Sequence, residues 1–113
     1  MHELSIMDSA LNLALEQARQ AGAQRVHALR LRVGAVSGVV ADSLRFAFDA
    51  LAEGTLAEGA QLVIENVPAR FWCPKCRNEF EPADFRPRCP ACGQTSNELR
   101  AGRELELASL EID

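Results

Sequence analysis

Four cysteines dominate the chemistry that this sequence could perform. They form two Cys-x-x-Cys pairs, Cys73 with Cys76 and Cys89 with Cys92, and twelve residues separate the pairs. Each pair can offer two thiolates to one side of a tetrahedral ion, a ligand set and spacing typical of zinc sites. Because four thiolates leave no open position for water, the pattern predicts a structural Zn2+ rather than a catalytic one.

Two other roles for the cysteines stay open. A pair of disulfides would need an oxidising compartment, and the opening Met-His-Glu-Leu has no feature of a secretion signal. A dithiol redox pair would need one thiol of lowered pKa, and a second matched pair is more than that chemistry requires. Zinc is therefore favoured over both.

The start of the chain could bind a different metal. Met1 offers its α-amine and His2 offers an imidazole and a backbone amide, and such nitrogen sets suit the square-planar preference of Ni(II) or Cu(II). The alternative for His2 is an ordinary solvated tail residue. Glu3 is a ligand, an orienting carboxylate or a favourable charge at a helix start, and the sequence does not choose among these roles.

Hydrophobic patterning predicts the elements that must position these residues. Apolar side chains recur every three or four residues over 4–21 and 41–52, which predicts two helices. Alternation predicts strands over 27–33, 61–67 and 104–112, the last with a bulge near residues 108–109. His27 is expected on the buried face of the first strand, in a packing or hydrogen-bonding role rather than as a metal ligand.

The composition changes sharply at Phe71. All five prolines lie between residues 68 and 90, and all four cysteines lie between residues 73 and 92. We therefore expect an α+β protein: residues 1–69 and 101–113 pack two helices on a small three-stranded sheet, and residues 70–100 form an inserted four-cysteine zinc-ribbon domain. Aromatic and basic side chains should surround the zinc: Phe71, Trp72, Phe80 and Phe85, with Lys75, Arg77, Arg86 and Arg88.

Composition also excludes several classes of function. The chain has 113 residues, a net charge of -4 and a pI near 5.2, which argues against a surface for nucleic acid. No apolar run is long enough to cross a bilayer, so we expect a cytoplasmic protein with no membrane partner. A phosphate-binding loop and a nucleophile with its base are both missing from the sequence, which predicts that the protein is not an enzyme.

Several segments together resemble the HypA/HybF family of hydrogenase nickel-insertion accessory proteins. They are the opening Met-His-Glu, the stretch Arg-Val-Gly-Ala-Val-Ser over 32–37, the segment Ser-Leu-Arg-Phe-Ala-Phe-Asp over 43–49, the two cysteine pairs and the closing Leu-Glu-Ile over 110–112. The resemblance covers essentially the whole chain. Its most specific feature is an initial Met-His-Glu combined with a zinc ribbon in the second half.

The resemblance implies a nickel metallochaperone. It assigns nickel to His2, helped by the amine of Met1 and the backbone or carboxylate of Glu3, and structural zinc to Cys73, Cys76, Cys89 and Cys92. Some relatives have an acidic ligand near the start of the second helix, where this chain has Val40, with Asp42 two positions on. The implied partners are a nickel-handling maturation GTPase and the large-subunit precursor of nickel–iron hydrogenase, and a homodimer is left open.

A function of another class competes with this one. The chain could be a zinc-ribbon adaptor that binds a protein or a nucleic acid through its arginines, with no nickel role for His2. Partner binding that does not depend on nickel would favour the adaptor.

Overall fold

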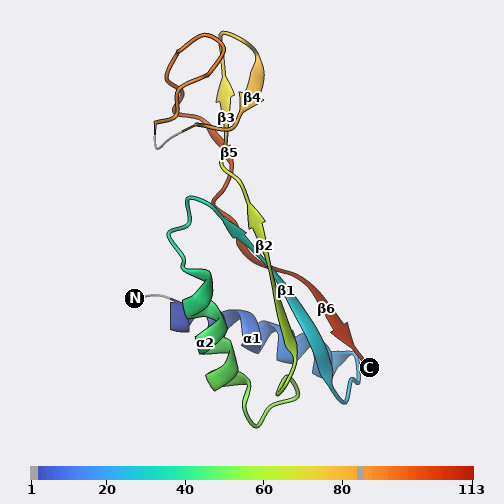
Figure 1. Ribbon diagram of the computed structural model, residues 1–113. Coiled ribbons are helices and arrows are strands. Elements are labelled where there is room, and N and C mark those ends of the chain that lie inside the picture. Colours follow the sequence, from blue (N-terminus) through green and yellow to red (C-terminus); the bar gives the residue numbers. More distant parts are fainter. Residues whose placement is uncertain (1–2, 84–85) are drawn as a thin grey trace. The chain divides into compact units, whose positions relative to one another are not determined.

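The computed structural model describes residues 3–83 and 86–113. Within this part of the chain, two helices alternate with two strands, and four further strands follow (Figure 1). No helix among the described residues is long and apolar enough to cross a membrane. The expected α+β class and its helices and small sheets are confirmed.

The two helices build most of the apolar core. Helix α1 (Glu3–Gln20) buries Met7, Leu11 and Leu15, and helix α2 (Ala41–Ala52) buries Leu44 and Phe48. These positions are three or four residues apart, so each helix has one apolar face, and the two helices pack on each other. The bounds predicted for α2 are those observed, and α1 begins and ends one residue earlier than predicted.

A three-stranded sheet completes this core. Its strand order is β2 (Gln61–Val67), β1 (Val26–Gly34) and β6 (Leu105–Ile112), so the last strand joins the first sheet as expected. The arrows of β1 and β2 point the same way and that of β6 points the opposite way (Figure 1). Strands β1 and β2 with α2 between them thus form a βαβ unit.

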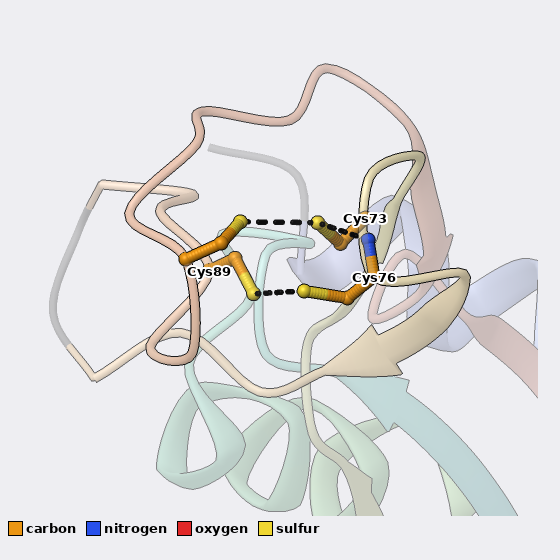
Figure 2. Close-up of side chains that lie close together, drawn as sticks. Cys73, Cys76 and Cys89 are labelled. Carbon is orange, nitrogen blue, oxygen red and sulfur yellow. Dashed lines mark hydrogen bonds between the residues drawn. The ribbon is translucent and has the colours of Figure 1, made fainter.

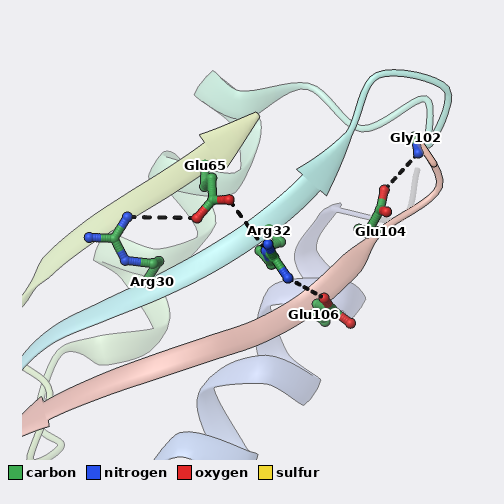
Figure 3. A network of polar contacts seen from close by, with 6 residues as sticks. All are labelled: Arg30, Arg32, Glu65, Gly102, Glu104 and Glu106. Carbon is green, nitrogen blue, oxygen red and sulfur yellow. Dashed lines mark hydrogen bonds and ion pairs between the residues drawn. The ribbon is translucent and has the colours of Figure 1, made fainter. Parts of the chain in front are cut away.

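Charged side chains cover the open face of this sheet. Arg32 on the central strand pairs with Glu65 of β2 (Nε–Oε2 3.3 Å) and with Glu106 of β6 (Nη1–Oε1 3.6 Å), and Arg30 reaches Glu65 at 3.8 Å (Figure 3). All four side chains are partly solvated, so the pairs add little stability, and they mark this face as polar.

The prediction that His27 lies on the buried face is wrong. Val26 takes the buried position at the start of β1, with no exposed surface, and His27 is exposed. The alternation of apolar and polar positions is regular only from Leu29 onward. The expected hydrogen-bonding role is confirmed, because Nε2 of His27 lies 2.6 Å from Oδ1 of Asp113 at the end of β6.

Burial along β6 changes phase where the sequence predicts a bulge. Leu107 is half-buried, the two residues at 108–109 are both exposed, and Leu110 and Ile112 are half-buried. Leu105 keeps 42% of its surface exposed. The apolar residues on the two sides of this break therefore need the extra residue between them to reach the same face.

The chain divides into two compact units by its contacts. The first comprises the residues up to Arg32, Gly38–Glu65 and Leu105–Asp113, and the second comprises Val33–Ser37 and Asn66–Glu104. The second unit holds its own sheet, in the order β4 (Asn78–Phe80), β3 (Arg70–Cys73) and β5 (Leu99–Ala101). The domain boundaries at residues 70 and 100 stay a prediction.

Two glycines allow a close backbone crossing inside the second unit. A Cβ on Gly34 would lie 2.0 Å from the carbonyl oxygen of Gly102, so only glycine fits at position 34. Gly102 has φ of +121° and would bring a Cβ to 2.9 Å from Cα of Ala69. Hydrogen bonds close the crossing: the N–H of Val36 donates to the oxygen of Gly102 at 2.8 Å, and the N–H of Gly34 donates to that of Glu104 at 2.7 Å.

Candidate metal sites

The second unit brings all four cysteines together. The sulfurs of Cys73 and Cys92 are 3.6 Å apart, those of Cys76 and Cys89 are 3.9 Å apart, and all four lie within 4.8 Å of one another. Figure 2 shows Cys73, Cys76 and Cys89 with their side chains converging on one point. No disulfide joins the four cysteines. The structure therefore gives the disulfide alternative no support.

Two turns of matched geometry position the cysteine pairs. After the first pair, the N–H of Arg77 donates to the carbonyl of Cys73 at 2.8 Å, and after the second, the N–H of Gly93 donates to that of Cys89 at 2.7 Å. Both residues have positive φ, +54° and +78°. Gly93 adopts this conformation without a steric cost, whereas Arg77 does so because the turn requires it. No sequence pattern around Arg77 predicts this conformation.

The first turn joins β3 to β4, and the second lies between Arg88 and Thr95, which form an isolated bridge. Ser96 connects the two arms: its hydroxyl donates to the carbonyl of Trp72 and accepts the N–H of Glu98 at 3.1 Å. Ser96 is the only buried polar side chain among the residues that the structure describes. Ser96 lies in a polar segment whose composition is typical of a loop, so sequence patterning could not have identified it as buried.

Part of the expected aromatic surroundings is present. Phe80 is buried with Cys73 and Cys89, and Phe71 stacks on it with 5.9 Å between ring centroids. Trp72 points elsewhere, since the guanidinium of Arg100 lies 4.6 Å from its ring centroid. Phe85 lies outside the described residues. Among the described residues, two phenylalanines therefore form the apolar wall beside the cysteines.

The thiols are electrostatically coupled. Contact with Cys92, followed by burial, raises the pKa of Cys76 to about 12. The backbone N–H of Cys92 lowers the pKa of Cys89 to about 7, and burial opposes this effect. Another backbone donor, the N–H of Cys76, lies 3.4 Å from the sulfur of Cys73. Lys75, Arg77 and Arg88, which were expected to offset thiolate charge, are exposed.

These distances fit a tetrahedral ion. At a metal–sulfur distance of ~2.3 Å, the sulfurs of a regular tetrahedron are roughly 3.8 Å apart, which is close to the two measured separations. Four adjacent thiols ionise together only when a cation compensates their charge. The cluster can therefore hold one metal ion with all four positions filled by protein.

The second candidate site, at the chain start, is described in part. Met1 and His2 lie outside the described residues. Glu3 is the first residue of α1, and its Oε2 accepts a hydrogen bond of 3.2 Å from the N–H of Val40, the N-cap residue of α2. Val40 provides no side-chain cap for its own helix. Asp42 lies in the first turn of α2, where the helix dipole stabilises its negative charge.

A family model that matches nearly the whole chain places it in a defined class, the nickel-incorporation accessory proteins. The model of the family described as hydrogenase/urease nickel incorporation, metallochaperone, hypA matches residues 1–112. The chain belongs to this HypA family, which confirms the predicted resemblance. The family consists of metallochaperones and maturation factors, so the protein is not an enzyme.

Individual relatives agree over their full lengths. The chain is 45% identical to the hydrogenase maturation factor HypA of Picosynechococcus sp. and 47% identical to that of Chloroflexus aggregans, covering 99% and 98% of both chains respectively. It is also similar to the solution structure of the Ni metallochaperone HypA from Helicobacter pylori, with a TM-score of 0.67, 25% identity and coverage of 99% of this chain and 97% of that one.

Proposed function

We propose that the chain carries Ni(II) as cargo at its N-terminus, in the cytoplasm, and helps to insert it into the large-subunit precursor of nickel–iron hydrogenase. The ligands in this proposal are the amine of Met1, the backbone and imidazole nitrogens of His2, and the backbone or carboxylate of Glu3. A nickel-handling maturation GTPase is the partner that exchanges nickel with the chain. Membership of the family supports the role in nickel incorporation.

The contact between Glu3 and Val40 is the observation that carries the proposed site. It fixes the first residue of α1 to the first turn of α2, although 37 positions separate the two residues in sequence. The proposed nitrogen ligands belong to residues 1–2, which directly precede Glu3 in the sequence. A carrier must release its metal, so its ligands must be accessible to an acceptor.

We further propose that the four cysteines hold Zn2+ in a structural role. Zinc has no geometric preference from its d-electrons and takes four thiolates in a tetrahedral arrangement, which the measured sulfur separations match. A unit of this size, with two phenylalanines as its core beside the cysteines, would depend on the metal for much of its stability. Bound zinc would also make a dithiol redox role inaccessible.

The nickel role is tested in cells that lack their own copy of this protein. Wild type and His2→Ala are expressed without tags, and the nickel content and activity of the hydrogenase are measured. We expect wild type to restore both and His2→Ala to restore neither at low external nickel, with equal amounts of the two proteins present. Equal rescue by His2→Ala would contradict the proposed site. The family description also names urease, so urease activity is the second readout.

A further inference from the structure

Three strongly exposed apolar side chains lie on the helical part of the chain, two where a helix begins and one in the middle of α2. Phe46 of α2 is 78% exposed, Val40 is 56% exposed and Leu4 is 51% exposed, which makes these three the most exposed large hydrophobic residues of the described chain. The bond between Glu3 and Val40 brings the starts of both helices together, and Leu4 is the next residue of α1. At 1.5 Å per residue, Phe46 lies ~9 Å along α2 from Val40.

Unpaired acidic side chains flank Phe46. At helical spacing, Asp42 lies four residues before it and Asp49 three residues after it, so both share its face of α2, and Glu53 directly follows the helix as its C-cap. All three are exposed, and none of them forms an ion pair with any residue of 3–83 or 86–113. Other acids of the chain are paired, for example Glu65 with Arg32 and Glu79 with Arg70.

The core does not account for this arrangement. Leu44, Ala47 and Phe48 provide the buried face of α2, and Phe46 lies opposite to them on the helix. A phenylalanine in water keeps its apolar area unburied, and aromatic side chains are enriched at protein interfaces, where they anchor binding. The first unit carries eleven acidic and five basic residues, so its charge of -6 adds a long-range attraction for a basic partner.

We propose that the patch made by Leu4, Val40 and Phe46, with its rim of Asp42, Asp49 and Glu53, is the docking surface for the protein that exchanges nickel with this chain. The partner presents an apolar hollow that receives Phe46 and a rim of Lys or Arg that faces the carboxylates. This assignment rests on the proposed function, because it places the partner beside the candidate nickel ligands. Phe46 supplies most of the affinity, and the carboxylates speed association.

The test measures binding of the zinc-loaded, full-length chain to the nickel-handling GTPase of the same organism by titration calorimetry. We expect Phe46→Ala to weaken binding at least about tenfold, as for an interface anchor. The matched control is Leu13→Ala: Leu13 is 49% exposed but lies ~13 Å further along α1 than Leu4, and its loss should change binding less than about twofold. In stopped-flow measurements a combined Asp42→Asn and Asp49→Asn variant should associate more slowly, and 0.5 M salt should remove the difference.

Each other outcome is decisive. If wild type binds the GTPase and Phe46→Ala binds equally well, the docking surface is overturned while the nickel role stands. If wild type does not bind the GTPase although it rescues hydrogenase in cells, the partner and this surface are both overturned. If sedimentation shows that the chain self-associates and that Phe46→Ala makes it monomeric, the occupant is a second copy and the proposal is wrong.

Discussion

The carboxylate of Glu3 accepts a hydrogen bond of 3.2 Å from the N–H of Val40, and this contact decides how the start of the chain can act. One oxygen of Glu3 is engaged by the backbone at the beginning of α2. A side chain held in this way can orient residues 1–2 without coordinating the metal itself. Of the three roles that the sequence leaves open for Glu3, the orienting role is the one that this hydrogen bond supports.

Two substitutions of Glu3 separate orientation from coordination. Glutamine keeps an oxygen that can accept the N–H of Val40, whereas alanine removes it. We expect Glu3→Gln to retain nickel affinity within about threefold and Glu3→Ala to lower it about tenfold, because only alanine frees the chain start. Nickel titration of tag-free protein checks this. A similar large loss in both variants would instead identify the carboxylate as a ligand.

Metal removal should unfold only part of the chain. The single tryptophan, Trp72, adjoins Cys73 in the second unit, whereas both helices belong to the first. We expect a strong chelator, or Cys76→Ser with Cys89→Ser, to shift the fluorescence of Trp72 toward that of a solvated indole and to leave the helical circular dichroism nearly unchanged. Loss of both signals together would show that the two units fold as one.

Zinc binding should release protons and weaken as the pH falls. In the metal-free cluster the pKa of Cys76 is about 12, so this thiol is protonated at pH 7 and zinc must displace its proton. The pKa of Cys89 is about 7, so below pH 7 zinc must displace a proton from this thiol as well. We expect the apparent affinity to fall about tenfold or more per unit between pH 8 and pH 7, and more steeply below pH 7. Competition with a chelator at several pH values measures this, and an affinity independent of pH would contradict the thiolate site.

The glycine crossing should tolerate no side chain. Alanine at Gly34 would place its Cβ 2.0 Å from a carbonyl oxygen, so we expect Gly34→Ala to lower the free energy of unfolding by about 3 kcal/mol or more. Gly38→Ala is the control: unlike Gly34, Gly38 has positive φ, +79°, and it has open space around it, so its substitution should cost only about 1 kcal/mol. Thermal unfolding of the zinc-loaded proteins compares the two, and equal losses would show that the crossing rearranges to accept the added methyl group.

Sequence reasoning succeeds here where the signal is local. The face of α2 that holds Leu44 and Phe48 follows from the helical period, and the spacing of the cysteine pairs predicts that Cys73 and Cys92 meet although 19 positions separate them. The regular alternation from Leu29 onward likewise indicates the central strand.

It fails where a residue depends on a distant partner. His27 was assigned to the wrong face because its role is set by Asp113, 86 positions away. The crossing of Gly34 and Gly102 and the bond between Glu3 and Val40 also join segments that no local pattern relates. The positive φ of Arg77 is imposed by the turn, and no property of arginine predicts it.

The most direct test of the central claim is a nickel titration of tag-free, zinc-loaded protein, wild type against His2→Ala, with zinc content measured in both. His27→Ala is the matched control, because it removes the other histidine, which lies at the start of β1 and pairs with Asp113. We predict one nickel bound per wild-type and per His27→Ala chain, binding lost or weakened at least about a hundredfold in His2→Ala, and unchanged zinc throughout. Nickel bound equally well by His2→Ala, or nickel bound only when zinc is lost, would contradict it.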